Sequence, residues 1–399
     1  MAINITNIIS VVNAKLAALD SNSTLEDIKR LNTINDYIVN VGGVLKYQAE
    51  SYLPPSTKGS IAFVERVIEH DSSNTGSYFL GLSQDSGWQR VFMTLDSADS
   101  AATTPPPVTV LFQGTSSGYV TGGTSPNVNT IQVFSLASDG NAVARTGTLL
   151  QAVNTMTGST SATHGYVLGG APTAHGTLIQ KFALAVDETA TDAGDLTAIT
   201  YGSVGISNGT GGFGYSAGGA NNQINIDKFS FTTDGNATNI GNITAREQYI
   251  GAGISATTHG YVVGGGPPAQ NRMEKFPFAV DENATDVGDL TVGRQQTAGA
   301  SSLENGYNAG GRTTVQVNII DKFPFAADTN ATDVGDLVTS RWVLAGSSST
   351  THGYACGGIN PGNTGGMNVI EKFSFVADGN ATDVGDLAVA KYGSSGHQL

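Results

Sequence analysis

The sequence predicts a mainly β fold, a six-bladed β-propeller with small N-terminal additions, and three observations support this prediction. The motif Gly-Tyr-x-x-Gly-Gly occurs six times, with tyrosines 46 to 49 residues apart at Tyr119, Tyr166, Tyr215, Tyr261, Tyr307 and Tyr354. A strand with a phenylalanine follows each copy at a similar period, at Phe134, Phe182, Phe229, Phe276, Phe323 and Phe373. Glycine accounts for 52 of 399 residues and charged residues for only 13%, which suits short strands joined by tight turns.

Composition and charge narrow the possible functions. The formal net charge is −14, so the surface repels phosphate and nucleic-acid binding is not expected. Cys356 is the only cysteine, which excludes an intrachain disulfide. The N-terminus has no basic region ahead of a long apolar run, and no apolar stretch approaches the roughly 18 residues of a membrane span. We therefore expect neither a secretory signal nor membrane insertion.

Residues 1–53 are predicted to form a helical N-terminal anchor. Apolar residues lie three and four apart along 5–19, and again along 25–41 after the capping pattern Ser23-x-x-Glu26, which indicates two amphipathic helices. Two short helices with narrow apolar stripes cannot make a core alone, so they must pack on their own domain, on sister chains or on a larger assembly. Docking to an assembly is favoured, through Ile8, Val12, Leu16, Leu25, Ile28, Leu31, Ile34 and Ile38.

Residues 54–95 are expected to form a small β module, and residues 96–107 a linker. Three runs typical of strands, 59–64, 78–82 and 88–92, are separated by turn residues. The linker is rich in Pro, Ala, Thr and Ser and ends in three consecutive prolines. It should therefore be extended and fairly stiff.

The propeller is expected to occupy residues 108–399, with four strands in each repeat. In the fourth repeat these strands are expected at 249–256, 260–265, 273–278 and 286–290. Paired glycines end the second strand, where we expect them to crowd the propeller axis. The repeated Tyr and Phe residues should pack between blades. The C-terminal segment 388–394 matches the opening strand of a further unit and should return to the first blade to close the ring.

The repeated motifs resemble two groups of proteins. Tyr-x-x-Gly-Gly followed by an apolar residue, Glu or Asp and Lys-Phe, with Arg246, Arg294 or Arg341 opening the next unit, resembles the kelch repeat over residues 108–399. The kelch tryptophan of the fourth strand is replaced by Gly-Asp-Leu. Glu-Lys-Phe-Ser/Pro-Phe followed by Asn-Ala-Thr-Asp-Val-Gly-Asp-Leu resembles virion structural proteins of marine bacteriophages, especially those of cyanobacteria. This second resemblance implies an N-terminal module that docks on the particle and a β domain that faces outward.

The histidines and the cysteine, which are potential metal ligands, do not form a pattern typical of a metal site or a catalytic site. His164, His259 and His352 each precede Gly-Tyr, but in separate repeats, which favours a turn or interblade hydrogen bond over one shared metal site. Cys356 lies in an Ala-Cys-Gly-Gly strand and is expected to be a small buried residue. We expect no metal, no cofactor and no enzymatic activity.

The repeated Asp-x-Asn-Ala-Thr segment is predicted to be a turn. Its copies at 281–285, 328–332 and 378–382 resemble the first ligand positions of a calcium loop, but the glycine and the distal glutamate of such a loop are missing. Asp and Asn side chains also bond to nearby backbone in turns. Turn stabilisation is therefore favoured over calcium binding.

Comparison of the repeats with one another predicts where recognition takes place. The Asp-x-Asn-Ala-Thr turn barely changes in the last three copies, whereas the segment between Gly-Gly and Lys-Phe changes completely. In a propeller these variable segments emerge on one face, and varied loops on a rigid scaffold commonly carry recognition; unconstrained drift is the alternative. The candidate recognition residues are Asn127, Asn129, His175, Asn221, Asn222, Gln223, Gln270, Asn271, Arg272, Arg312, Gln316, Asn360, Asn363 and Asn368.

These observations together favour a non-enzymatic structural protein of a phage particle. It would be a tail fibre or another surface component located on the virion, docked through its N-terminal part. Its expected partners are other virion proteins and a host-surface glycan or receptor, and a homo-oligomer is expected, with a trimer favoured. Three alternatives remain open: a capsid decoration protein of the same architecture, a propeller enzyme acting on polysaccharide, and a cellular kelch-like scaffold.

Overall fold

The computed structural model describes residues 113–399, except 125, 210, 221–222, 245–248, 250, 360–361 and 363–364, and the backbone of four strands between residues 46 and 93. The chain divides into two compact units, Met1–Val108 and Thr109–Leu399. The expected N-terminal helices with their docking residues, and the linker 96–107, lie outside the described residues.

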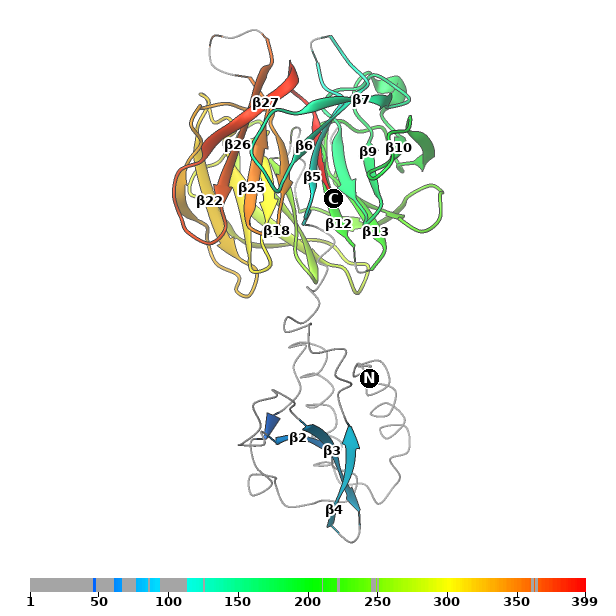
Figure 1. Cartoon of the computed structure of the whole chain (residues 1–399). Helices are drawn as coiled ribbons and strands as arrows, with labels where there is room; N and C mark the ends of the chain where they lie inside the picture. The colour runs from blue at the N-terminus through cyan, green and yellow to red at the C-terminus, as the bar shows by residue number, and fades with distance from the viewer. Residues whose placement is uncertain are drawn as a thin grey trace. The chain divides into compact units, whose positions relative to one another are not determined.

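A four-stranded sheet is described in the first unit. The three expected runs form antiparallel strands, and a further short strand, which the sequence did not indicate, pairs parallel to the first of them. The sheet contains β1 (Lys46–Tyr47), β2 (Ile61–Arg66), β3 (Ser77–Gln84) and β4 (Gly87–Met93) (Figure 1).

The second unit consists of six four-stranded antiparallel sheets, the six-bladed propeller that the repeats predict. Blade 1 contains, from the innermost strand outward, β28 (Ser395–Gln398), β5 (Ser117–Thr121), β6 (Thr130–Ser135) and β7 (Val143–Thr148). Blade 2 contains β8 (Thr157–Thr160), β9 (His164–Leu168), β10 (Leu178–Ala183) and β11 (Thr191–Asp195), with the 3-10 turn η2 (Thr173–His175) between β9 and β10.

The other four blades repeat this order along the chain. Blade 3 contains β12 (Val204–Asn208), β13 (Phe213–Ala217), β14 (Asn225–Ser230) and β15 (Thr238–Asn242). Blade 4 contains β16 (Ala252–Ser255), β17 (His259–Gly265), β18 (Gln270–Pro277) and β19 (Thr285–Asp289). Blade 5 contains β20 (Ala298–Ser301), β21 (Asn305–Ala309), β22 (Ile319–Pro324) and β23 (Thr332–Asp336), and blade 6 contains β24 (Ala345–Ser348), β25 (His352–Cys356), β26 (Met367–Ser374) and β27 (Thr382–Lys391).

The C-terminal strand closes the ring. Each innermost strand contacts the next, and β28 contacts both β24 and β8, so that the blades enclose one axis. β28 pairs with β5, with Ser395 opposite Thr121 and Gln398 opposite Gly118, and the C-terminus lies beside β5 in Figure 1. The expected closure is confirmed, but the closing strand begins at Ser395, directly after the segment 388–394. Most of that segment extends β27 instead.

The glycines that crowd the axis are not the paired ones. Gly158, Gly205, Gly253, Gly299, Gly346 and Gly396 form a ring on the innermost strands, and a Cβ on any of them would lie 1.9 to 2.7 Å from a carbonyl oxygen of the neighbouring ring glycine. The expected location of the paired glycines at the axis was wrong, but a side chain on them would clash, as predicted: a Cβ would lie 2.9 Å from the Val153 carbonyl oxygen at Gly122 and 2.6 Å from the Thr200 carbonyl oxygen at Gly169. The paired glycines end the second strand of each blade with positive φ, as at Gly310 (67°) and Gly311 (102°), and turn the chain away from the strand.

The repeated tyrosines and phenylalanines pack between blades, as predicted. Each Tyr ring faces the Phe ring of an adjacent blade, at centroid distances from 5.3 to 6.0 Å. The Phe134–Tyr354 pair joins blade 1 to blade 6, so this aromatic contact is repeated all the way round. Each aromatic pair contributes about 0.5–1.5 kcal/mol to stability beyond the burial of its surface area. Because the same pair recurs at every junction, the six blade interfaces are similar in construction.

Candidate functional site

The antiparallel strands give the propeller two different faces. Each blade has four strands, numbered 1 to 4 from the axis outward. The face that we call the clasp face carries the connections between strands 1 and 2 and between strands 3 and 4. We call the opposite face, with the strand 2–3 loops and the connections into the next blade, the variable face. The variable segments of the sequence cover the loops between strands 2 and 3 together with some adjoining strand residues, and we refer to these six segments as the strand 2–3 loops (122–129, 169–177, 218–225, 264–272, 310–318 and 357–368). The Asp-x-Asn turns lie on the clasp face.

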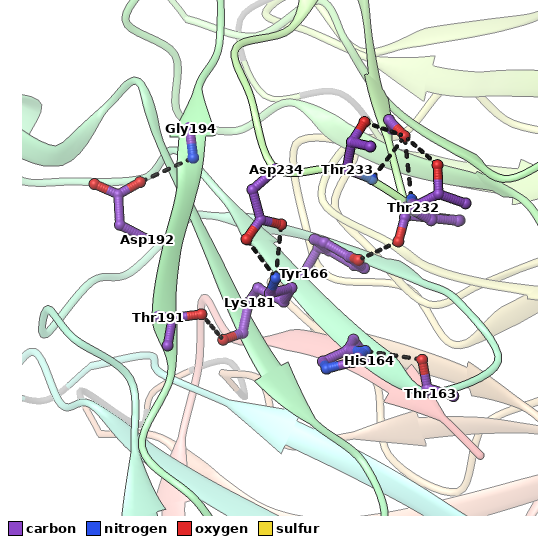
Figure 2. A network of polar contacts seen from close by, with 12 residues as sticks. Thr163, His164, Tyr166, Lys181, Thr191, Asp192, Gly194, Thr232, Thr233 and Asp234 are labelled. Carbon is purple, nitrogen blue, oxygen red and sulfur yellow. Dashed lines mark hydrogen bonds and ion pairs between the residues drawn. The ribbon is translucent and has the colours of Figure 1, made fainter.

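On the clasp face, an ion pair joins every two neighbouring blades. In Figure 2, Lys181 of β10 reaches Asp234 in the turn of blade 3, and both carboxylate oxygens lie 2.6 Å from Nζ. Four more Lys–Asp pairs repeat this contact, and Arg145–Asp187 takes its place between blades 1 and 2. The aspartates are about half exposed, so each pair contributes at most about 1 kcal/mol.

The asparagine of the same turn fastens the neighbouring backbone. In five turns its Oδ1 accepts a hydrogen bond of 2.9 to 3.1 Å from an N–H at the outer strand of the preceding blade. Blade 2 has Thr189 instead, and the Asp187 carboxylate accepts from Thr146 and Gly147 N–H; these bonds lower the pKa of Asp187 to about 2. The first Asp and the Asn of the segment therefore join neighbouring blades, whereas bonds to the backbone of their own turn were expected. A local bond of the expected kind is made by the Asp that follows, such as Asp286, which accepts from the Gly288 N–H at 3.2 Å.

A second ring of interblade contacts lies on the third strands. One polar residue on each third strand is buried and accepts a backbone N–H from the preceding blade: Gln132, Gln180, Asp227, Glu274, Asp321 and Glu371. The donor lies in the connection that leaves that blade, except for Gln132, whose donor Ala388 lies in the extended β27. Sequence reasoning missed this ring. The available signal was a polar residue at one fixed position of an otherwise apolar strand, directly before Lys-Phe in five of the six repeats.

Buried arginines complete two of these contacts. Arg294 pairs with Asp321 at 3.1 Å and donates to the Asn308 carbonyl, while Arg341 pairs with Glu371 and donates to the Ala355 carbonyl. All four charged side chains are inaccessible to solvent. Arg246, which the sequence places in the same role, lies outside the described residues.

The histidines and the cysteine have local structural roles. His164, His259 and His352 lie on blades 2, 4 and 6, and each Nδ1 is 2.8 Å from the hydroxyl of the preceding threonine. Burial lowers the pKa of all three. These are turn contacts, as expected. Cys356 is buried in β25, and burial raises its pKa to about 12, which keeps the thiol protonated near neutral pH.

The variable face brings together most of the candidate recognition residues. Those that the structure describes belong to the strand 2–3 loops or their ends: Asn127, Asn129, His175, Gln223, Gln270, Asn271, Arg272, Arg312, Gln316 and Asn368. Asn221, Asn222, Asn360 and Asn363 lie outside the described residues.

Four of these side chains also have hydrogen-bond or ion-pair partners within the protein. Asn129 donates to the Leu149 carbonyl at 3.3 Å, and Gln270 donates to the Pro268 carbonyl at 2.9 Å. Asn127 accepts a hydrogen bond from Asn154 at 2.5 Å, and Arg272 pairs with Glu274 at 3.0 Å. These residues therefore help to hold the loops in place as well as bordering the surface.

Aromatic side chains that sequence reasoning missed lie in four connections between blades on the variable face. Tyr201, Tyr249, Trp342 and Tyr392 lie in the connections into blades 3, 4, 6 and 1, and all four are half-buried. The connections are tied to the strand 2–3 loops by backbone pairs such as Trp342–Ile359 and Tyr392–Thr124. The face thus combines rigid amphipathic rings with amide side chains, a composition that suits binding surfaces.

The same connections contain non-glycine residues in a left-handed conformation. Thr155, Tyr249, Gln296 and Val343 have φ between 51° and 76°. Three of them, Thr155, Gln296 and Val343, lie three residues before the axial glycine, where two other blades have Gly202 and Gly393. Val343 is β-branched and disfavours this region strongly. Its N–H donates to the Gln296 carbonyl at 2.8 Å and its carbonyl accepts from Gly393 at 3.2 Å. These bonds from adjacent connections retain the strained conformation.

The axis encloses a polar cavity of about 140 Å³, lined by the innermost strands. Its lining is dominated by glycine, serine, threonine and alanine and includes no charged side chain. Gln113 lies near its clasp-face end and donates to the Ser301 and Ser349 carbonyls at 3.0 and 3.2 Å. The described chain therefore enters the propeller on the clasp face.

Comparison with known proteins gives no family for this chain, since no protein-family model and no curated protein matches it. In the described part of the chain, no three His, Cys, Asp or Glu side chains are grouped so that they could hold a metal ion. No helix among the described residues is long and apolar enough to cross a membrane.

Proposed function

We propose that the protein is a non-enzymatic structural component of a phage particle and that it uses the variable face for recognition. In this proposal it is a tail fibre or another surface protein, anchored through residues 1–95, and its partners are other virion proteins and a host-surface glycan or receptor. The resemblance of its repeats to marine phage virion proteins supports the location on the particle. A trimer remains the favoured assembly.

The contrast between the two faces is the observation that carries the recognition role. On the clasp face, the Asp-x-Asn turns have similar sequences in most repeats, and their side chains form ion pairs and hydrogen bonds between blades. On the variable face, loops of six different sequences lie over the same scaffold. A rigid ring with one uniform and one diversified face is suited to binding through the diversified face.

Two further roles deserve a direct comparison with this proposal. A capsid decoration protein would have the same architecture with a different position on the particle. A polysaccharide-acting propeller enzyme would use the half-buried aromatic rings of the variable face as a sugar platform, with Trp342 and Tyr201 as candidate contacts. These roles differ in particle location and in product release, and both can be measured.

The first experiment labels intact particles with antibodies raised against the full-length chain. Labelling of the tail supports a tail fibre, labelling spread over the head supports a decoration protein, and the absence of the chain from purified particles contradicts the proposal. In parallel, full-length protein is incubated with host envelope polysaccharide. Reproducible release of oligosaccharides would identify an enzyme and overturn the non-enzymatic assignment.

A further inference from the structure

The junction of blades 5 and 6 on the variable face carries an arginine stacked on a tryptophan. The Arg312 guanidinium lies 4.7 Å from the centroid of the Trp342 ring. The Arg312 backbone exchanges two hydrogen bonds of 3.0 Å with Gln295, and the Trp342 backbone exchanges bonds of 3.2 and 2.9 Å with Ile359. Both side chains therefore extend from fixed backbone, and the pair is held in place before any ligand binds.

Arg312 differs from the other propeller arginines whose side chains are described. Each of those pairs with a carboxylate: Arg145–Asp187, Arg272–Glu274, Arg294–Asp321 and Arg341–Glu371. No carboxylate among the described residues pairs with Arg312, and its guanidinium makes only the ring contact; the residue as a whole is half-buried. Stacking uses the face of the guanidinium, so the N–H groups along its edge are left for an external acceptor.

The surroundings of Arg312 leave further polar groups without partners. The indole Nε1 of Trp342 and the Oε1 of Gln295 are both buried and unbonded within the described structure. A buried unpaired donor or acceptor costs about 1–3 kcal/mol, and such groups are uncommon in folded proteins. Both groups belong to residues that contact Arg312, through the Trp342 ring and the Gln295 backbone. Unbonded buried atoms also occur at other interfaces, as at Gln180 and Tyr215, but only at this junction do they lie beside an arginine without a carboxylate partner among the described residues.

Charge on the loops favours an anionic ligand. None of the 33 Asp and Glu residues of the chain falls in the six strand 2–3 loops, which contain only His175, Arg272 and Arg312 as basic residues. The chain is strongly acidic overall, so the absence of acid from these loops removes local repulsion towards a carboxylate. The loops are instead rich in Asn, Gln and Thr, which can hydrogen-bond to sugar hydroxyls.

We propose that Arg312 and Trp342 form a subsite for a carboxylate-bearing sugar, such as a uronic acid residue within a polysaccharide. The edge of the guanidinium binds the carboxylate with two hydrogen bonds, the indole holds the guanidinium plane, and the amide-rich loops bind the hydroxyl groups. This inference rests on the proposed recognition role of the variable face and names its ligand class.

The test measures binding of uronic acid oligosaccharides to the full-length chain by calorimetry. The probes are an oligogalacturonate, an oligoglucuronate and the methyl ester of each, in which the carboxylate is neutral. We expect at least one acidic probe to bind, and its ester to bind about 10- to 100-fold more weakly, as expected for loss of a charge-assisted bidentate contact. Arg312→Gln should weaken the acidic probe to the same extent, and Arg312→Lys should weaken it less.

The controls separate this subsite from general charge and from the broader function. Lys322→Gln removes one positive charge from the clasp face and should leave binding unchanged. Equal binding of an acidic probe and its ester would overturn the carboxylate subsite while leaving saccharide recognition intact. Failure of both acidic probes, or unchanged binding by Arg312→Gln, would also overturn the subsite. Tetraglutamate binding as tightly as the oligosaccharides would overturn its assignment to sugar, and antibody labelling of particles would still test the particle role independently.

Discussion

At the residue scale, the axial glycines set how closely the inner strands approach one another. A Cβ on Gly205 would lie 2.0 Å from the Gly158 oxygen and 2.6 Å from its carbonyl carbon. Because backbone atoms cannot rotate away, Gly205→Ala should force the two inner strands apart and destabilise the propeller by about 1–3 kcal/mol or more. Gly235→Ala is the matched control, since its Cβ would meet nothing within 4 Å. Urea unfolding of both variants measures the difference, and equal stability would contradict the crowding argument.

His397 provides a second prediction at this scale, for the pH dependence of stability. It is fully buried at the closing seam, where its ring packs edge-on against Phe182 at 5.1 Å and its Nδ1 lies 3.2 Å from the Ser159 carbonyl. Burial lowers its pKa from 6.5 to about 4. Between these values the unfolded chain binds the proton more readily than the folded chain, so stability should fall as the pH drops from about 6.5 to about 4.

The full effect of this histidine is of the order of 3 kcal/mol, and it is absent above pH 6.5. His397→Gln removes the titrating group and should flatten this part of the pH profile. The measurement is the free energy of unfolding of both proteins by denaturant at pH 7 and at pH 4.5. Since the two proteins share all other acid-sensitive groups, the difference between their pH profiles reports His397. Parallel profiles would show that the folded histidine accepts a proton without penalty.

At the element scale, the third strands join the blades through buried charge, and the pairs differ greatly in exposure. Arg341 and Glu371 are inaccessible to solvent, whereas the Lys322–Asp378 pair lies at the surface with Asp378 about half exposed. Arg341→Met would leave the Glu371 carboxylate buried without its cation and should cost about 3–5 kcal/mol. Lys322→Met should cost at most about 1 kcal/mol, and less at high salt. Thermal and urea unfolding at two salt concentrations would compare them, and similar losses would refute the assignment of buried charge to blade joining.

The elements show what the sequence could and could not predict. The period of the tyrosines and phenylalanines located six blades and their interfaces, because each Tyr–Phe pair recurs at every junction. The paired glycines were misplaced because positive φ and close packing both favour glycine, and sequence alone does not separate the two causes. The Arg312–Trp342 stack was not predictable for another reason: its partners are 30 residues apart in different blades and occur at only one junction, so no repeat pattern marked them.

At the scale of the whole molecule, the six blades of the propeller are built alike and differ mainly in the loops of the variable face. The aromatic pairs, the clasp ion pairs and the third-strand hydrogen bonds each recur at all six junctions, including the one that joins blade 6 to blade 1. Each blade is stabilised mainly by its neighbours, as in other repeat architectures. A ligand that binds one junction therefore meets a stiff ring in which the loop sequences, rather than the scaffold, differ from place to place.

Closure by four residues makes this ring dependent on the C-terminus. β28 supplies the innermost strand of blade 1, pairs with β5 along its whole length, and contacts β8 and β24 on either side. A chain ending at Ser394 would leave the inner edge of β5 unpaired, remove Gly396 from the axial ring and remove His397 from the seam. Since an exposed strand edge is prone to pairing with other chains, this truncation should lower the unfolding temperature by more than any substitution above and should promote association. His397→Gln is the appropriate control, because it retains the backbone pairing of β28. Calorimetry and size-exclusion chromatography would test the difference, and a truncated chain as stable and as monodisperse as the control would show that the blades hold together without a closed ring.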